Sequence, residues 1–304
     1  MKVIAEICSN VKNLKDCFKS IDMAAEAGAD YVKFQYFTDR DMYGMNLGYK
    51  PILNLDEIPQ LSKYARNMGI GFSCTFFNPE TLRANSQYID FIKIASSDML
   101  YEDLLKQAKD LHKLILLSTG GHTEEQVEKA LTWIDNRRLV LMYCESAYPA
   151  KRTDLDKLEV LKIFTKKIGV SDHSLDVYQT PILARDLGVL YFEKHVNFLD
   201  YTDTPDAPHS LSHKEFQDMM SKLKGKKRLN LLSPDEMPMV SMYNRRCVAT
   251  KKITAGEKLI YGENFGYYRS LKPETEGFRL TSYLKGKVAK REILQGQTIT
   301  GRYI

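Results

Sequence analysis

Short apolar runs alternate with amphipathic segments along the chain from Lys2 to about Lys222. The apolar runs are short enough to be buried strands, and the segments between them show the hydrophobic spacing of helices. The predicted strands are Val3–Ile7, Tyr31–Gln35, Gly71–Cys74, Phe91–Ala95, Leu114–Leu117, Leu139–Tyr143, Ile168–Val170 and Leu190–Phe192. Three of the predicted helices are Leu14–Ala27, Thr123–Ile134 and Leu175–Leu187. Eight strand–helix units predict an α/β fold of the (β/α)8 TIM-barrel type, because a doubly wound sheet normally has fewer strands and a glycine-rich first turn.

Two of the predicted strands lead into a histidine. Ile168–Val170 is followed by Ser171-Asp172-His173, and the run that ends at Phe192 is followed by Glu193-Lys194-His195. In parallel α/β proteins the catalytic groups gather at the carboxyl ends of the strands, because the loops there can carry them. Two histidines in these places could share one metal ion. The alternative is a pair of hydrogen-bonded core histidines.

Polar or ionisable residues stand at the carboxyl end of every predicted strand. Among them are Lys33 and Lys93, which lie within or beside apolar runs, where lysine is unusual. A buried ammonium group is costly without a paired anion, so two of them indicate a phosphate or carboxylate held between them. The hydroxyl groups that would surround the same anion are those of Ser96, Ser118, Ser146 and Ser171. The alternative is that both lysines extend from strand edges to solvent.

Composition narrows the classes of function. The chain has 304 residues, of which 43% are hydrophobic, and no apolar run approaches the ~18 residues of a membrane span. The N-terminus enters a strand-like run without the pattern of a signal peptide, and five cysteines without metal-site spacing suit a reducing compartment. We therefore expect a cytoplasmic protein. A net charge of +5 suits small anionic substrates, and we expect neither a nucleic-acid nor a membrane partner, since basic residues cluster only at 222–228.

The composition changes after the predicted barrel domain, residues 1–222. Residues 223–242 contain two prolines and a basic cluster without periodicity, which predicts a linker. Residues 243–304 contain a near-repeat, in which the stretch Val248–Glu257 is similar to Val288–Gln297. This pattern predicts a small β-rich domain with internal pseudo-symmetry. A domain of about sixty residues is marginally stable alone, so we expect it to dock on something larger.

These features together resemble the sialic acid synthase, or nonulosonate synthase, family. The family joins a phosphoenolpyruvate-condensing TIM barrel to a C-terminal antifreeze-like (SAF) domain. The barrel motifs that carry the resemblance are IAEI at 4–7, AGADYVKFQ at 27–35, FIKIASSD at 91–98, LSTGG at 117–121, YCESAYP at 143–149, GVSDHS at 169–174, EKH at 193–195 and TPD at 204–206. In the last domain VATKKITAGEKL resembles the opening of the SAF domain, and YYR stands at 267–269.

The resemblance implies a transferase that condenses phosphoenolpyruvate with an open-chain N-acylated amino hexose. The products would be phosphate and a nine-carbon 2-keto acid of the N-acetylneuraminate, legionaminate or pseudaminate type, for cell-surface polysaccharide. His173 and His195 would bind a divalent metal, usually Mn²⁺ in this family, with Mg²⁺ and Co²⁺ as alternatives. The implied phosphoenolpyruvate cradle consists of Lys33, Lys93, Ser96, Ser118, Ser146 and Ser171.

The resemblance also assigns the remaining site residues. Asp98, Glu6 and Lys93 would be the catalytic groups, while Tyr148 and Asp206 would face the sugar or the reacting centre. Arg269 matches an arginine that reaches into the site of a second subunit, which implies a domain-swapped homodimer.

Three positions depart from the family pattern. Asp98 stands where glutamate is frequent, Cys8-Ser9-Asn10 replaces an Asn-His pair, and Thr204 begins a triplet that usually reads Gly-Pro-Asp. They lie on the sugar side of the site, so they bear on which sugar is bound more than on the class of reaction. SAYPA at 146–150 is similar to the pseudaminic acid branch. The alternatives are a phosphosugar-using synthase of the octulosonate type, which usually lacks a SAF domain, and a non-catalytic sugar-binding relative.

Overall fold

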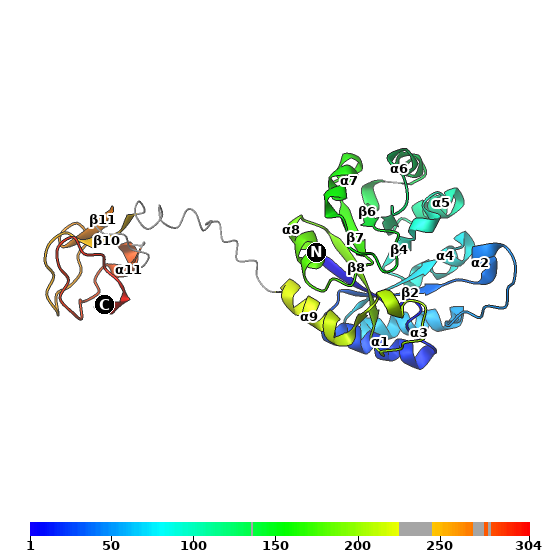
Figure 1. Ribbon diagram of the computed structural model, residues 1–304, viewed down its shortest axis with the longest axis horizontal. Coiled ribbons are helices and arrows are strands. Elements are labelled where there is room, and N and C mark those ends of the chain that lie inside the picture. Colours follow the sequence, from blue (N-terminus) through cyan, green and yellow to red (C-terminus); the bar gives the residue numbers. More distant parts are fainter. Residues whose placement is uncertain (135, 225–244, 270–276, 279–280) are drawn as a thin grey trace. The chain divides into compact units, whose positions relative to one another are not determined.

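The chain folds into two compact units, Met1–Lys226 and Lys227–Ile304, and each is described by itself. The computed structural model describes residues 1–134, 136–224, 245–269, 277–278 and 281–304 (Figure 1). Most of the predicted linker, from 225 to 242, therefore lies outside the described residues.

The first unit is a nearly closed barrel of eight parallel strands, as predicted. The strands are β1 Lys2–Glu6, β2 Tyr31–Tyr36, β3 Gly71–Phe76, β4 Phe91–Ile94, β5 Leu114–Ser118, β6 Leu139–Cys144, β7 Ile168–Asp172 and β8 Tyr191–Asn197. Their order around the barrel is β3-β2-β1-β8-β7-β6-β5-β4. Between β3 and β4 two side chains supplement one backbone bond, from the Asp90 N–H to the Phe72 carbonyl at 2.9 Å. The Asp90 carboxylate accepts the Phe72 N–H and the Ser73 hydroxyl donates to the Phe91 carbonyl, both at 2.8 Å.

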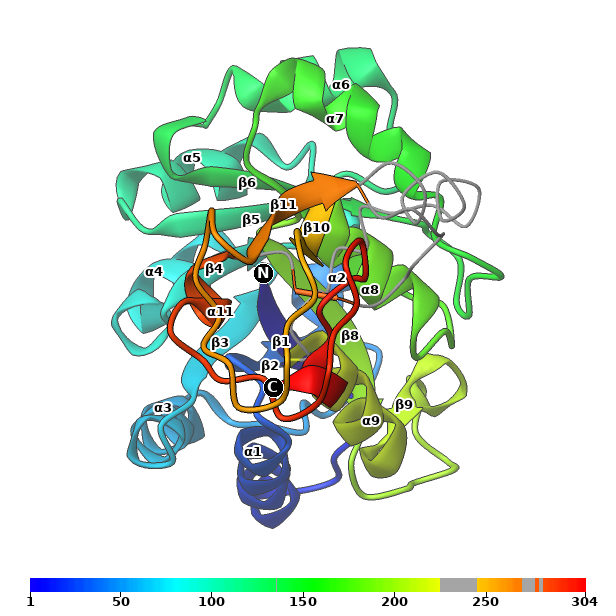
Figure 2. The ribbon, with the colours of Figure 1, turned by 90° about the vertical axis from the view of Figure 1, so that its left-hand side faces the viewer.

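Helices surround the strands on the outside (Figure 2). They are α1 Leu14–Ala27, α2 Asp39–Tyr43, α3 Ile58–Asn67, α4 Pro79–Asn85, α5 Glu102–Asp110, α6 Glu124–Leu131, α7 Leu158–Phe164, α8 Gln179–Asp186 and α9 His213–Lys224. A short strand, β9 Leu211–Ser212, pairs with β8 just before α9. Helix α9 continues two residues past the predicted boundary at 222.

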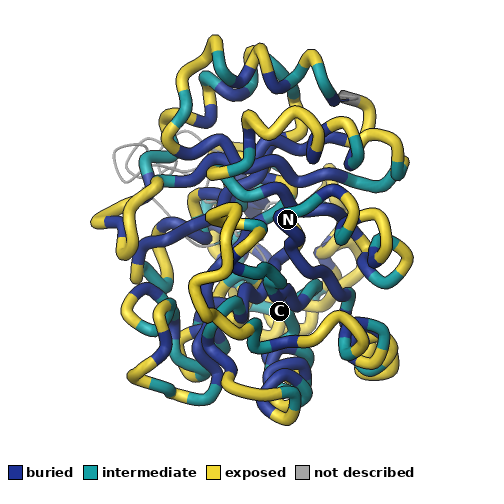
Figure 3. The backbone as a smooth tube through the Cα atoms, turned by 90° about the vertical axis from the view of Figure 1, so that its right-hand side faces the viewer, coloured by how far each residue is buried: buried dark blue, intermediate teal, exposed yellow. Residues whose placement is uncertain are grey.

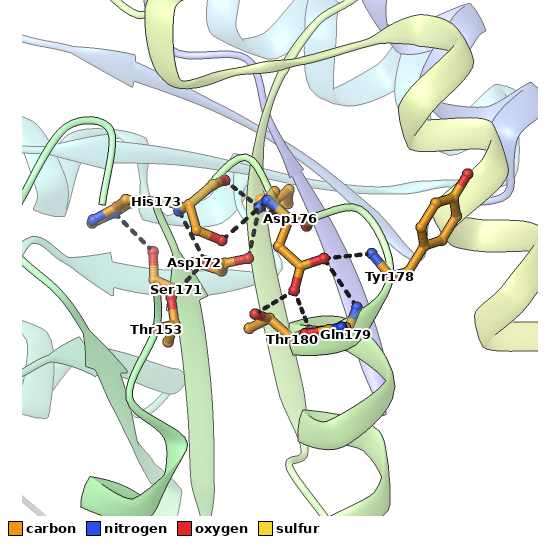
Figure 4. A network of polar contacts seen from close by, with 10 residues as sticks. Thr153, Ser171, Asp172, His173, Asp176, Tyr178, Gln179 and Thr180 are labelled. Atoms are coloured by element: carbon orange, nitrogen blue, oxygen red, sulfur yellow. Dashed lines mark hydrogen bonds and ion pairs between the residues drawn. The ribbon is translucent and has the colours of Figure 1, made fainter. Parts of the chain in front are cut away.

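Hydrogen bonds at the helix ends explain where the observed helices agree with the predicted bounds and where they differ from them. Helix α1 has the predicted bounds, because Asn13 caps its first turn and Gly28, with φ of 80°, ends it. Helix α8 was predicted to begin at Leu175 but begins at Gln179. The Asp176 carboxylate accepts the backbone N–H groups of Tyr178, Gln179 and Thr180, so the preceding residues form a turn instead (Figure 4).

The barrel wall separates two hydrophobic regions. The main core lies between the strands and the helices, where the outward residues of the strands pack. A smaller cluster fills the amino end of the barrel interior and contains Ile4, Phe91, Leu116, Val140 and Met142. The barrel strands are buried along most of their length, whereas the helices are exposed on their outer sides (Figure 3). Above the small interior cluster the inward side chains become polar, and this change creates the site.

The second unit contains an antiparallel pair, β10 Arg245–Ala249 and β11 Phe265–Arg269, with the short helices α11 Thr281–Leu284 and η8 Gly301–Tyr303. The predicted pseudo-symmetry is present in its hydrogen bonds. Ile253 and Ile293 exchange two backbone bonds of 2.9 Å, while Gly256 donates to Ala289 and Gly296 to Ala249. The two copies of the near-repeat thus pair with each other. Across the described residues, no helix has the length and apolar character to cross a membrane.

Candidate active site at the carboxyl end of the barrel

A cavity of about 470 Å³ opens among the carboxyl ends of the strands. Its lining includes ten of the residues that the sequence indicated, namely Lys33, Lys93, Ser96, Ser118, Ser146, Tyr148, Ser171, His173, His195 and Asp206. These residues come from six strands, β2 and β4 to β8, or the loops that follow them. The alternation of side chains along a strand brings them together, because residues two apart face the same side of the barrel wall.

The floor of this cavity is a buried cluster of charges. Lys33 Nζ contacts the Glu6 carboxylate, lies 3.7 Å from Glu193 and donates to Thr75 Oγ1 at 3.1 Å. Lys93 Nζ lies 3.6 Å from Glu193 and donates to Ser118 Oγ at 2.9 Å. Both lysines are at most 5% exposed, so they do not extend to solvent from strand edges.

The two carboxyl groups of this cluster differ in their electrostatics. Burial alone would raise the pKa of Glu193, but Lys33 and Lys93 outweigh it and lower this pKa to about 2. Burial raises the pKa of Glu6 to about 7, although Lys33 opposes the shift. Glu193 is therefore ionised at neutral pH, whereas Glu6 can gain or lose a proton there.

Glu193 lies where the sequence predicted a ligand anion. Its carboxylate stands between Lys33 and Lys93 and accepts a 2.8 Å hydrogen bond from Ser171 Oγ. Buried lysines alone thus do not require a ligand. The sequence offered a signal for Glu193, because it stands two residues before His195 on one strand and must share its face.

His173 follows β7 and is oriented by its neighbours. Its Nδ1 lies 2.7 Å from the Glu145 carbonyl oxygen, which makes Nδ1 the protonated nitrogen and leaves the lone pair on Nε2. Nε2 is 3.4 Å from Ser171 Oγ (Figure 4). Burial is the largest cause of a lowered pKa of His173, so the ring is neutral at pH 7. Tyr148 packs on this ring with centroids 4.3 Å apart.

The loop behind His173 is fixed by a separate buried pair. Lys194 Nζ lies 2.6 Å from Asp172, and Thr153 Oγ1 donates to the same carboxylate at 2.6 Å. Lys194 also donates to the carbonyl oxygen of Ser174. Asp172 and Lys194 are outside the barrel wall and do not line the cavity. They hold the turn that carries His173.

His195 lies deeper, with its ring centroid 5.7 Å from that of His173. Burial lowers its pKa to about 3, and its Nδ1 has no hydrogen-bond partner among the described residues. Neutral imidazoles with unprotonated nitrogens are the form that binds metal ions. The two histidines therefore fit a divalent metal ion, and the orphaned nitrogen of His195 is the observation that supports this fit.

Asp206 is held by a residue at which the chain departs from the family pattern. The Ser9 N–H and hydroxyl donate to Asp206 Oδ2 at 2.9 and 2.6 Å. Asn10 and Thr204 are also departures from the family pattern, and they contact each other, because Asn10 Oδ1 accepts a hydrogen bond of 2.8 Å from Thr204 Oγ1. Burial would raise the pKa of Asp206, but contacts that include His209 outweigh it and hold this pKa well below its usual range. The departures after β1 and after β8 thus form one connected loop structure.

Three of the predicted site residues do not line the cavity. Glu6 lies beneath Lys33 with 0% exposure. Asp98 lies in the short helix Ser96–Asp98 and accepts from Ser97 Oγ at 2.8 Å, while burial raises its pKa. Arg269 is at the exposed end of β11 in the second unit. Their assigned roles remain predictions.

A larger cavity of about 860 Å³ adjoins the first and shares Gly120, His122, Cys144 and Ser146 with it. Gly120 is required at this place, because a Cβ there would come within 2.5 Å of Ser146 Oγ and of Cys144 Sγ. The close approach of the loops after β5 and β6 positions Ser146. The sequence did not indicate this second cavity, since loops and outer helices form it.

The sequence pattern of the NeuB family matches residues 20–229, more than two thirds of the chain. The chain belongs to the NeuB family. The match includes β2 to β8 and therefore most of the cavity. This result confirms the family to which the sequence motifs pointed.

Similar proteins of this family include named synthases. Pseudaminic acid synthase of Helicobacter pylori is 28% identical, over 93% of this chain and 94% of the relative. N,N'-diacetyllegionaminic acid synthase of Campylobacter jejuni is 26% identical, over 92% and 93%. The structure of N-acetylneuraminic acid synthetase from Leptospira borgpetersenii is 26% identical with a TM-score of 0.69, and covers 78% of this chain and 89% of that one.

Proposed function

We propose that this NeuB-family chain is a nonulosonate synthase, which joins phosphoenolpyruvate to an open-chain N-acylated amino hexose. The observation that carries the proposal is the convergence on one cavity of ten residues that the sequence and its family resemblance indicated. The relatives, named as pseudaminic, legionaminic and neuraminic acid synthases, support the class of product. Transfer of the three-carbon unit of phosphoenolpyruvate to the sugar, with phosphate as the leaving group, would make the enzyme a transferase that forms a carbon–carbon bond.

Phosphoenolpyruvate would bind at the floor of the cavity. Lys33 and Lys93 supply positive charge, and each already donates to a hydroxyl group, of Thr75 and Ser118 respectively. A phosphate there would share the lysines with Glu193, whose opposing charge keeps the empty cluster near neutrality. Ser96, Ser146 and Ser171 line the same cavity and complete the proposed cradle.

The acceptor sugar would lie nearer the mouth, beside His173, His195, Tyr148 and Asp206. A divalent metal held by His173 and His195 would polarise the sugar aldehyde as a Lewis acid. Tyr148 is about half exposed, so its ring presents an apolar face and a hydroxyl to the sugar. Asp206 stays ionised and can accept hydrogen bonds from sugar hydroxyls.

The chain's own groups supply the other steps. C3 of phosphoenolpyruvate bonds to the aldehyde carbon, water adds at C2, and the phosphate leaves with the bridging oxygen. Lysines beside the phosphate stabilise the charge that develops on it. Glu6 has a pKa of about 7 and lies beneath Lys33 without lining the cavity, so a proton that water loses would reach it through Lys33. Asp98 is the second proposed acid–base group.

The second unit would be a SAF domain that acts across a homodimer. Its paired near-repeats and the YYR stretch ending at Arg269 support this part of the proposal. Mixed dimers of inactive His195→Ala and inactive Arg269→Ala chains should regain activity, because one of their two sites would keep every group. Failure to regain activity, with subunit exchange shown separately, would contradict the swapped arrangement.

The test of the function is a phosphate-release assay with phosphoenolpyruvate and a panel of N-acylated amino sugars. The panel should contain N-acetylmannosamine and the 2,4-diacetamido hexoses that lead to legionaminate and pseudaminate. We expect phosphate release only with an acceptor, together with a nine-carbon 2-keto acid in equal amount by mass spectrometry. Phosphate release with a phosphorylated pentose alone would favour an octulosonate-type synthase instead.

A further inference from the structure

A second histidine stands beside His195, and neither motif nor family pattern indicated it. His195 on β8, Asp206 in the following loop and His209 in the short helix Ala207–His209 place one potential ligand atom each within 4.8 Å of one another. Within the described part of the chain, this is the one group of three such residues. The rings of His195 and His209 are 4.7 Å apart.

Both imidazoles in this group have a buried nitrogen without a hydrogen bond. These atoms are Nδ1 of His195 and Nε2 of His209. The two residues are 6% and 5% exposed. His209 Nε2 lies 3.3 Å from Asp206 Oδ1 but without the angles of a hydrogen bond. A buried polar atom without a partner is costly, so two in one place point to a ligand that binds both.

The carboxylate of the group is already oriented. Ser9 holds Asp206 Oδ2 with two hydrogen bonds, which leaves Oδ1 on the side of His209. The hydroxyl of Ser210, next to His209, donates to the Asp206 carbonyl oxygen at 2.7 Å. Hydrogen bonds of this kind behind a carboxylate are typical of metal sites, where they fix the ligand before the ion arrives.

We propose that His209, which lies behind the cavity lining, is a metal ligand, and that it binds a divalent ion together with His195 and Asp206, which line the cavity. The proposal rests on the proposed function in taking the cavity as one that uses a metal. Bonds of about 2.1 Å keep neighbouring ligand atoms roughly 3–3.5 Å apart, so a shift of about 1 Å would close the group around an ion.

This ligand set also determines which ions bind. Two imidazoles and one carboxylate suit Mn²⁺, Fe²⁺, Co²⁺ or Zn²⁺, whereas Mg²⁺ prefers oxygen ligands and retains its water. Tyr148 packs against His209 as well as His173, with centroids 5.1 and 4.3 Å apart. His173, the other histidine proposed to hold the ion, lies beside the group, with its ring centroid 5.7 Å from that of His195.

The test is calorimetric titration of Mn²⁺ and Mg²⁺ into the metal-stripped full chain, without substrates. We expect Mn²⁺ to bind at least tenfold more tightly than Mg²⁺, and His209→Asn to lose at least tenfold in Mn²⁺ affinity. His112→Asn is the matched control, because His112 is exposed and its φ of 54° is one that asparagine tolerates. Equal affinities of His209→Asn and the control for Mn²⁺ would overturn the proposal.

A second variant keeps the test decisive if His209→Asn is unstable. His209→Cys loaded with Co²⁺ should show a thiolate-to-cobalt charge-transfer band in the near ultraviolet, and its absence in folded protein would also overturn the proposal. The two proposals fail separately. Metal binding through His209 without acceptor-dependent phosphate release would contradict only the function, and the reverse result would contradict only the role of His209.

Discussion

Glu193 and Lys194 are neighbours on β8, but their side chains lie on opposite sides of the barrel wall. Outside, Lys194 pairs with Asp172 and donates to carbonyl groups, and every polar atom of Asp172 and Lys194 has a partner. Inside, Lys33 and Lys93 share Glu193, whose Oε2 lacks a hydrogen bond, as do both Glu6 oxygens. The outer pair is complete, whereas the inner cluster is not.

Whether the hydrogen bonds of a buried charge are complete distinguishes structural from functional lysines better than burial does. All of these lysines are nearly inaccessible, and a buried charged pair by itself says little about stability or activity. The outer pair fixes the turn that carries His173, so its role is positional. The inner cluster opens onto the cavity, where an anionic substrate would contact Lys33 and Lys93, and its atoms without a hydrogen bond are carboxylate oxygens, which can take up a proton.

The largest expected effect is on the outer pair. Lys194→Met leaves the Asp172 carboxylate buried without a counter-charge, so the free energy of unfolding should fall by about 3–5 kcal/mol. Urea unfolding measures this loss. The double variant Lys194→Met/Asp172→Asn should recover most of it. A loss below about 1 kcal/mol would show that the pair is not structural.

Replacing one inner lysine leaves the other beside Glu193, so folding should change less than it does in Lys194→Met, and binding should change more. Replacing Lys33 or Lys93 with methionine removes a charge-assisted contact to phosphoenolpyruvate, worth about 1.5–3 kcal/mol, or roughly 10- to 150-fold in affinity. Sugar affinity should change much less. The exposed Lys63→Met is the control for charge. Unchanged phosphoenolpyruvate affinity in both inner variants would exclude the proposed cradle.

The pH dependence of stability reports on Glu6. Its pKa is raised from 4.5 to about 7 in the fold, so the native state holds a proton that the unfolded state releases. The contribution of Glu6 is therefore fully present below about pH 4.5 and is lost as the pH rises through 7. Glu6→Gln should gain stability relative to the unchanged protein between pH 5 and pH 8, on the order of 2 kcal/mol. A difference that does not vary with pH would contradict the raised pKa.

The smallest effects come from two matched hydroxyl groups. Ser171 donates to Glu193 inside the barrel, and Thr153 donates to Asp172 outside it. Ser171→Ala should weaken phosphoenolpyruvate binding, while Thr153→Val should lower stability, each by about 1 kcal/mol. Calorimetric titration measures the affinity of both variants for phosphoenolpyruvate, and thermal unfolding measures their stability. Equal effects on binding and stability in the two variants would remove the distinction between the regions.

The barrel could be predicted from sequence because its signals are local. Each strand is a short apolar run, and Lys33 or Lys93 stands out in such a run without knowledge of the fold. The histidines were recognisable because they end two strands. Helix α8 was predicted four residues too early, since the side chain of Asp176 competes with helical bonding, which hydrophobic spacing does not reveal.

The remainder of the site depends on contacts between distant parts of the chain. His209 lies in a loop without a motif, and its relation to His195 follows only from how that loop folds back. Ser9 and Asp206 are 197 residues apart yet share three hydrogen bonds. Glu193 was hidden for another reason, because its place in the EKH motif drew attention to the histidine alone.

A crystal structure of the chain with phosphoenolpyruvate and Mn²⁺ tests the central claim most directly. The account predicts the phosphate at the cavity floor, within hydrogen-bond distance of Nζ of both Lys33 and Lys93, with the Asp172–Lys194 pair unchanged. Phosphoenolpyruvate in the adjoining 860 Å³ cavity, with Lys33 and Lys93 still bonded only within the chain, would contradict it.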